Sequence, residues 1–216
     1  MLLRGEKPET SWWYPDEHEK LAKGHARWRD IHEYILPRLA DSPKRICVQA
    51  GGAVGVWPIT FAGHFDQVMS FEPNPVLREC FERNIEDRKV HNVHIIPKGL
   101  WDSEGTASLS NPLPHPHNKG AWFLDLDGDD FEITYLDKYN LTDVDLIQWD
   151  IEGAELWALE GGKETIERCR PMIVLENKVD AVRNFHTSVE AVHDKMHDLG
   201  YDHVFSYARD EIWMPK

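Results

Sequence analysis

A short apolar run that leads into a glycine-rich turn constrains the fold of this chain more than any other feature. Residues 46–50 have the pattern of a buried strand, residues 51–55 read Gly-Gly-Ala-Val-Gly, and a second apolar run at residues 68–71 ends in Glu72. A strand, a glycine turn, a helix and a strand that ends in an acid form the first unit of a nucleotide-binding α/β sheet, whose acid accepts hydrogen bonds from ribose hydroxyls. The sequence therefore predicts a cofactor that contains adenosine.

The glycine spacing argues against a nicotinamide dinucleotide. The dinucleotide fingerprint needs glycine at its first, third and sixth positions. Counting from Ala50, this chain has alanine, Gly52 and Gly55 at those positions, so the first glycine is missing. A nicotinamide oxidoreductase is therefore disfavoured, and hydride transfer with NADH would be needed to revive that reading.

Further acids follow later strands. Residues 144–149 form another apolar run, and Asp150 and Glu152 come directly after it. In an extended segment, side chains two residues apart point to the same side, so both acids could act on one substrate. Because open α/β sheets bind ligands at the carboxyl ends of their strands, we expect these acids at the same edge as Glu72. Glu155 is expected to begin the next helix, where an acid complements the helix dipole.

The motifs together resemble the signature of the FkbM-type S-adenosylmethionine-dependent methyltransferases. That signature reads Asp-Val-Gly-Ala-Asn-x-Gly, Phe-Glu-Pro-Asn, Leu-Asp, Lys-x-Asp-x-Glu-Gly-Ala-Glu and a late Glu. The corresponding segments of this chain are residues 49–55, 71–74, 136–137, 148–155 and 175–177. Its most specific part is Asp-x-Glu-Gly-Ala-Glu at residues 150–155. Two departures from the pattern matter most: Gln49 replaces Asp, and Gln148 replaces Lys.

The resemblance implies which residues form the site. Those expected to bind S-adenosylmethionine are Gln49, Gly51, Gly52, Glu72, Asn74, Gly99, Leu100, Trp101 and Asp150. Those expected to carry the chemistry are Asp150, Glu152 and Glu176. Glu72 would hold the ribose, and Leu100 and Trp101 could enclose the adenine, although Trp101 equally fits ordinary core packing. No metal is assigned, while the acidic strand ends leave room for a divalent ion.

The implied reaction is methyl transfer to an oxygen of a small molecule or a glycan. An alternative from a different class is a catalytically degenerate methyltransferase fold that senses the cofactor or binds a partner. That alternative is motivated by Gln49 and Gln148, whose neutral side chains replace charged residues of the family pattern. Transfer of a labelled methyl group would separate the two.

The order of apolar patterns predicts an α/β fold with a mostly parallel sheet of seven strands and helices on both faces. The resemblance implies that this is a Rossmann-like class I methyltransferase fold with an N-terminal helical cap. Predicted strands lie at residues 45–49, 68–72, 93–97, 144–149, 171–176, 203–207 and 211–214, and predicted helices at residues 54–63, 75–88, 155–168 and 188–199. The last two strands should form a hairpin.

Two segments are expected to be added to this fold. Residues 1–44 precede the domain at residues 45–216, and within them residues 16–39 have a helical apolar stripe that Pro37 should distort in its last turn. The aromatic residues 12–14 are predicted to dock onto the main domain. Residues 104–143 contain short strand patterns and a run with three prolines, so we expect a substrate-selecting loop there.

Composition limits the choice of partner and compartment. The formal net charge of −14 disfavours nucleic acid as a substrate. Twelve acids and one base lie between Phe123 and Glu160, which fits either a solvated acidic face or a site for cations. The three widely spaced cysteines and the lack of a long apolar stretch favour a soluble cytoplasmic protein without a membrane partner. The oligomeric state is left open.

Overall fold

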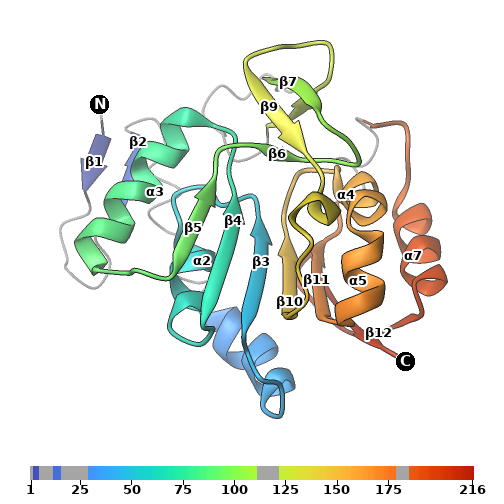
Figure 1. Ribbon diagram of the computed structural model, residues 1–216. Helices are drawn as coiled ribbons and strands as arrows, with labels where there is room; N and C mark the ends of the chain where they lie inside the picture. The colour runs from blue at the N-terminus through green and yellow to red at the C-terminus, as the bar shows by residue number, and fades with distance from the viewer. Residues whose placement is uncertain (1, 5–11, 16–28, 111–121, 179–184) are drawn as a thin grey trace.

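A computed structural model describes residues 2–4, 12–15, 29–110, 122–178 and 185–216 of the chain. Its centre is a sheet of seven described strands in the spatial order β12 (Tyr201–Tyr207), β13 (Asp210–Pro215), β11 (Met172–Glu176), β10 (Val144–Trp149), β3 (Ile46–Ala50), β4 (Gln67–Phe71) and β5 (Val93–Ile96) (Figure 1). From β11 to β5 the neighbouring strands run parallel, and β13 runs antiparallel to both β11 and β12. The predictions of a mostly parallel seven-stranded sheet and of a final hairpin are confirmed.

The central strands place alternate side chains in two hydrophobic layers. Val48 and Ile147 belong to one layer, and Cys47 and Leu146 belong to the other. The first layer is completed by α4 (Glu155–Gly161), α5 (Lys163–Cys169) and α7 (Val189–Asp198). The second is completed by α2 (Val56–Ala62) and by the one-turn helices η2 (Ile31–Ile35) and η3 (Leu36–Leu39). Strands covered on both sides are apolar throughout, which explains their continuous hydrophobic runs.

The connections around β3 place the candidate site. The chain passes from β3 to β4 and β5 on one side of the sheet, and then to β10 and β11 on the other side of β3. Ligands of open α/β sheets bind at such a reversal, beyond the carboxyl ends of the strands. The residues that follow β3, β4, β10 and β11 are therefore the ones whose geometry matters for function.

Helix boundaries agree with the sequence where local signals specify them. Helix α3 (Pro75–Arg88) has its predicted bounds, because the Asn74 side chain accepts hydrogen bonds from the N–H groups of Val76 and Leu77 and Pro75 occupies the first turn. The single helix predicted at residues 155–168 is wrong, because two helices, α4 and α5, meet at Gly162. A side chain at Gly161 would collide with the backbone oxygen of Trp101. None of the described helices has the length and apolar character needed to cross a membrane.

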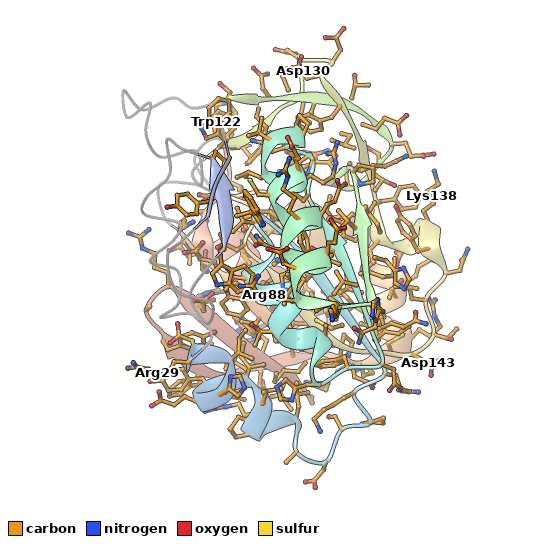
Figure 2. All side chains as sticks on the ribbon, turned by 90° about the vertical axis from the view of Figure 1, so that its left-hand side faces the viewer. Arg29, Arg88, Trp122, Asp130, Lys138 and Asp143 are labelled. Atoms are coloured by element: carbon orange, nitrogen blue, oxygen red, sulfur yellow. The ribbon has the colours of Figure 1, made fainter. Side chains whose placement is uncertain are left out.

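The described N-terminal residues dock on α3. Strand β1 (Leu2–Arg4) pairs antiparallel with β2 (Trp13–Pro15), so this segment is not wholly helical as expected. Asn84 of α3 accepts a hydrogen bond from the Trp13 N–H at 2.8 Å and donates to the Trp13 carbonyl at 3.0 Å. Arg88, labelled in Figure 2, lies over the Trp12 ring with its guanidinium carbon 3.7 Å from the ring centroid. These contacts agree with the predicted docking role of the aromatic residues.

The expected helix at residues 16–39 is described from residue 29 onward. Ile31, Ile35 and Leu39 are buried against the sheet, which agrees with the predicted apolar stripe. Pro37 lies in η3, where the tighter 3₁₀ winding replaces the α-helical turn. The distortion predicted for Pro37 is therefore present.

The two short strand patterns predicted within residues 104–143 are confirmed as β7 (Gly105–Ser110) and β9 (Phe131–Thr134), which belong to a second sheet. Its four described strands have the order β6 (Gly99–Leu100), β9 (Phe131–Thr134), β7 (Gly105–Ser110) and β8 (Phe123–Asp125). The short helix η4 (Leu136–Tyr139) returns the chain to β10. This sheet lies beyond the carboxyl ends of the main strands, as Figure 1 shows, and Asp130 marks its outer end in Figure 2. The proline-rich residues 111–121 lie outside the described residues.

Candidate functional site

Glu72 follows β4 and is held by backbone amides from two different loops. Its Oε2 accepts a hydrogen bond from the Ala53 N–H at 2.6 Å, and its Oε1 accepts one from the Asn74 N–H at 2.8 Å. Burial raises the pKa of Glu72 to about 7, while the two backbone hydrogen bonds and Arg78 oppose this shift. The carboxylate thus joins the glycine turn to the start of α3. Each of its oxygens has a further lone pair with which to accept a hydrogen bond from a ligand diol.

The glycine turn lies between Glu72 and Asp150. Gly51 has a φ of +80°, and a side chain there would collide with the backbone oxygen of Asp150. A side chain at Gly52 would meet the Cβ of Glu72 at 3.2 Å. The N–H groups of both glycines are 3.1 Å from the Phe71 carbonyl oxygen. Close packing inside the protein is therefore sufficient reason for two glycines, and their predicted contact with the cofactor stays a prediction.

Gln49 and Gln148 lie side by side on two neighbouring parallel strands. They are paired in register between β3 and β10, and both side chains are buried. Gln49 accepts a hydrogen bond from the Ser70 hydroxyl at 2.6 Å and donates to the Ala50 carbonyl at 2.9 Å. Neither amide atom of Gln148 has a hydrogen-bond partner among the described residues. The two departures from the family pattern thus concern one pair of adjacent positions.

The acids predicted to carry the chemistry come together. One side-chain oxygen each from Asp150, Glu152 and Glu176 lie within 4.8 Å of one another. They were expected to point to the same side because they lie two residues apart in an extended segment. That reason was wrong, because β10 ends at Trp149 and Glu152 is not extended but has a φ of +55°. Gly153, with a φ of +104°, completes the turn. A left-handed turn between β10 and α4, and not strand alternation, brings the carboxylates together.

Lys178 completes this cluster and was not among the predicted site residues. Its Nζ lies 3.2 Å from Asp150 Oδ1 and 2.7 Å from Glu152 Oε1, and it also forms an ion pair with Glu176 Oε2. A signal for this residue was present in the sequence. Lys178 lies two positions after Glu176, and side chains two residues apart along an extended segment point to the same side.

The protonation of the cluster follows from burial and from its charges. Burial, followed by the hydrogen bond with Asp150 and its charge, raises the pKa of Glu176 to about 9. Burial also raises the pKa of Glu152, which Lys178 lowers. For Lys178 burial lowers the pKa, but the three carboxylates outweigh it and raise the pKa above its usual range. At neutral pH Glu176 therefore holds a proton and Lys178 stays charged, so the cluster can both accept and donate hydrogen bonds.

Four other predicted cofactor residues have structural roles in their own right. The Asn74 side chain caps α3, and a side chain at Gly99 would meet Leu124 at 3.0 Å. Leu100 is buried in the main core. Trp101 stacks on Trp157, with ring centroids 5.3 Å apart, which agrees with the core-packing alternative for this residue. A contact of these residues with the cofactor stays a prediction.

Glu155 has the helix-starting role that was favoured for it. It is the first residue of α4, and its Oε1 accepts a hydrogen bond from the Ile151 N–H at 3.0 Å. Burial raises its pKa to about 7. This hydrogen bond ties the start of α4 to Ile151, the residue before Glu152, and so helps to hold the turn on which Glu152 lies.

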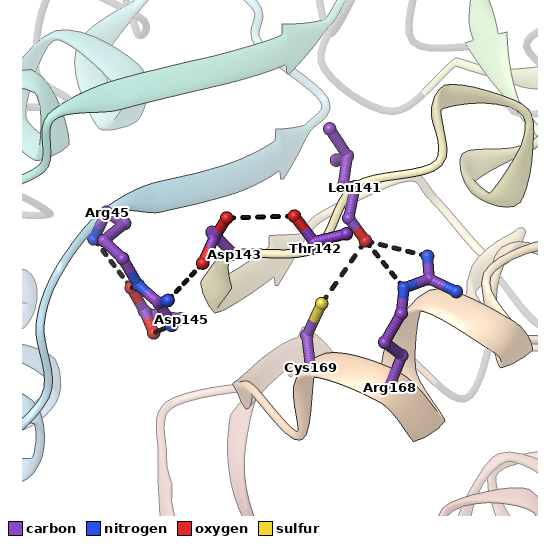
Figure 3. Close-up of polar contacts among 7 residues, drawn as sticks. All are labelled: Arg45, Leu141, Thr142, Asp143, Asp145, Arg168 and Cys169. Atoms are coloured by element: carbon purple, nitrogen blue, oxygen red, sulfur yellow. Dashed lines mark hydrogen bonds and ion pairs between the residues drawn. The ribbon is translucent and has the colours of Figure 1, made fainter.

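Two of the acids between Phe123 and Glu160 form ion pairs at the edge of the sheet opposite this site. Asp143 and Asp145 form ion pairs with Arg45 at the amino ends of β3 and β10, as Figure 3 shows. Nearby, Arg168 and Cys169 donate to the carbonyl of Leu141. These contacts close the edge of the sheet opposite the candidate site. Asp143 and Asp145 therefore have a structural role and are not part of the cluster around Asp150.

Comparison with protein families gives a match over most of the chain. Residues 62–202 match the Methyltransferase FkbM domain, which is well over half of the 216 residues. The matched range contains Glu72, the motif at residues 150–155 and Lys178, and it begins after the glycine turn. No curated protein matches the sequence.

Solved structures are similar in fold. One is methyltransferase FkbM from Methylobacillus flagellatus KT, 16% identical with a TM-score of 0.52, where the match covers 79% of this chain and 43% of that protein. The chain thus spans less than half the length of that relative. Another is magnesium protoporphyrin IX methyltransferase from Synechocystis PCC 6803 with bound S-adenosylmethionine, 10% identical with a TM-score of 0.54, covering 94% and 85%. These similarities show a Rossmann-like class I methyltransferase fold.

Proposed function

Because the chain belongs to the FkbM methyltransferase family, we propose that it transfers a methyl group from S-adenosylmethionine to a hydroxyl oxygen of a small molecule or a glycan. The observation that carries this proposal is the position of Glu72. It directly follows β4 and joins the glycine turn to α3. A carboxylate in that position is suited to accept the two hydrogen bonds of a ribose.

The residues present fit the cofactor in their chemistry. Glu72 offers acceptors for the ribose, and the glycine turn beside it packs closely against the backbone of Asp150. The predicted contacts of Gln49, Gly51, Asn74 and Leu100 would complete the binding region. When bound, S-adenosylmethionine would supply a methyl group to the acceptor oxygen, with S-adenosylhomocysteine as the leaving group.

The acid cluster is suited to hold the acceptor. Methyl transfer needs the acceptor oxygen to be aligned and to lose its proton, and alignment carries much of the rate acceleration. In our proposal the carboxylate of Asp150 or Glu152 accepts that proton. Glu176, which holds a proton at neutral pH and hydrogen-bonds Asp150, holds that carboxylate in position toward the acceptor. We propose no metal ion, nucleic acid or membrane partner.

The alternative of a degenerate, non-catalytic fold depends on Gln49 and Gln148. Because the two residues are register neighbours, their replacement of Asp and Lys removes one negative and one positive charge from the same place. The net charge beside the cofactor region is then the same as in the family pattern. This pairing weakens the argument for lost function and favours the enzyme.

Calorimetry with S-adenosylhomocysteine tests the cofactor half of the proposal. We expect binding by the wild type and a loss of about tenfold or more in affinity for Glu72→Gln. Lys163→Gln, an exposed change on α5, serves as the control. Absence of binding by the wild type would reject the enzyme assignment.

Transfer of a radiolabelled methyl group to pools of metabolites and glycans tests the acceptor half. We expect labelling that survives chelation of divalent ions and that is lost in Asp150→Asn. Cofactor binding without any labelled product would favour the degenerate alternative instead. Labelled product in which the methyl group is on nitrogen or carbon would contradict the choice of oxygen.

A further inference from the structure

We propose that Lys178 is the resident cation of the acceptor site, where its ammonium group takes the place between Asp150, Glu152 and Glu176 that a divalent metal ion would otherwise occupy. In that place it acts as a positioning residue, because it holds the carboxylates that face the acceptor. The inference about the acceptor rests on the function proposed above. The inference about the cation rests on the geometry alone.

Lys178 contacts all three acids of the cluster. An ammonium group has three N–H donors and accepts none. Lys178 Nζ donates hydrogen bonds to Asp150 Oδ1 at 3.2 Å and to Glu152 Oε1 at 2.7 Å, and it forms an ion pair with Glu176 Oε2. One oxygen from each acid lies within 4.8 Å of one from each of the others, close enough to surround a single small cation.

Burial makes a cation necessary at this point. The side chains of Glu176 and Glu152 are 2% and 14% exposed, and that of Lys178 is 18% exposed. Carboxylates that are brought together away from water repel one another and lose their hydration, so they need a partner of opposite charge. The structure meets this need in two ways, with the proton on Glu176 and with the ammonium group of Lys178.

The chemical consequence is an acceptor site that works without a metal. Lys178 opposes the rise in the pKa of Glu152 that burial causes, and so favours the ionised carboxylate that can take a proton from the acceptor.

Manganese binding tests the proposal without any knowledge of the acceptor. Water-proton relaxation would be measured with Mn²⁺ for the wild type, Lys178→Arg, Lys178→Gln and Lys178→Gln combined with Glu152→Gln. We expect the wild type and Lys178→Arg to bind no Mn²⁺ at this cluster, and Lys178→Gln to gain one site at least about tenfold tighter than any site of the wild type. The added Glu152→Gln change should abolish that gain. Rescue by arginine separates a role of the charge from a role in packing.

Two results would overturn the proposal. The first is a wild-type protein that binds Mn²⁺ and loses it on Glu152→Gln, because the carboxylates would then be a metal site in their own right. The second is a folded Lys178→Gln protein that gains no Mn²⁺ binding. If Lys178→Gln does not fold, the wild-type measurement still decides. Since no cofactor is used, failure here is distinct from failure to bind S-adenosylhomocysteine.

Discussion

Gln49 and Gln148 are paired in register on neighbouring parallel strands, and both amide side chains are buried. Where the family pattern has an acid and a base, this chain has two neutral groups side by side. A charge introduced at one of the two positions would therefore be buried without a partner, whereas charges introduced at both would meet. The effect of a charge at one position should therefore depend on the residue at the other.

We expect Gln49→Asp and Gln148→Lys each to lower the free energy of unfolding by about 3 kcal/mol, the usual result of a buried charge without a partner. The double variant should recover part of that loss, with a coupling energy of about 1–3 kcal/mol. Urea denaturation of the four proteins at neutral pH measures this. Additive losses would show that the two side chains do not interact.

Any gain in S-adenosylmethionine affinity from an acid at residue 49 should appear in the double variant, by calorimetry.

Replacing each glutamine by methionine should have opposite effects. Gln148→Met removes a buried amide without hydrogen-bond partners among the described residues, so the free energy of unfolding should rise by about 1 kcal/mol. Gln49→Met leaves the buried Ser70 hydroxyl without its acceptor, so stability should fall by about 1–3 kcal/mol. Thermal and urea unfolding compare the matched pair. Equal losses in both variants would mean that the Gln148 amide is satisfied in solution.

The raised pKa of Glu72 predicts how cofactor affinity depends on pH. Burial raises this pKa from the usual 4.5 to about 7, so the folded protein holds the proton more tightly than the unfolded chain does. The stability contributed by this proton is complete below about pH 4.5 and is lost as the pH rises through about 7. Ribose hydroxyls donate to the ionised form, so the affinity for S-adenosylhomocysteine should increase over the upper part of this range.

Calorimetry between about pH 6 and pH 8 checks this dependence, which Glu72→Gln should flatten. Glu155→Gln is the matched control, because burial raises the pKa of Glu155 to about 7 as well. It should change the pH dependence of stability and leave that of binding unchanged. A pH dependence of binding that disappears in Glu155→Gln and persists in Glu72→Gln would contradict the assignment of Glu72 to the ribose.

Asn84 should be essential for docking the N-terminal segment. Its side chain is fully buried and joins Trp13 to Val54, which precedes α2. Asn84→Leu leaves several buried backbone groups unpaired and should cost about 2–4 kcal/mol. Asp87→Ala removes an exposed hydrogen bond to the Trp13 indole and should cost less than about 1 kcal/mol. Urea unfolding compares the two, and similar losses would mean that the segment is held in some other way.

Local signals explain the parts of the fold that could be predicted. The start of helix α3 was found because an asparagine cap and a proline mark it in the sequence, and the structure ends the helix at Lys89, which is left-handed. The core strands were found because strands buried on both faces are continuously apolar. Glu72, Asp150 and Glu176 were found because acids that follow such strands collect at one edge of the sheet.

Long-range contacts explain what could not be predicted. The break at Gly162 depends on how closely the neighbouring Gly161 approaches the backbone of Trp101. The second sheet depends on pairing between β6 and β9, whose residues are distant along the chain. Neither contact leaves a pattern in the local sequence.

The sequence by itself determined the order of strands and helices, the glycine turn and the acids at the strand ends, because periodicity, caps and turn residues act over a few positions. Only the tertiary structure decided that Gln49 lies opposite Gln148 and that the Lys178 ammonium lies among three carboxylates. Register and side-chain packing join residues far apart in the chain, and their energies depend on neighbours that no local pattern specifies.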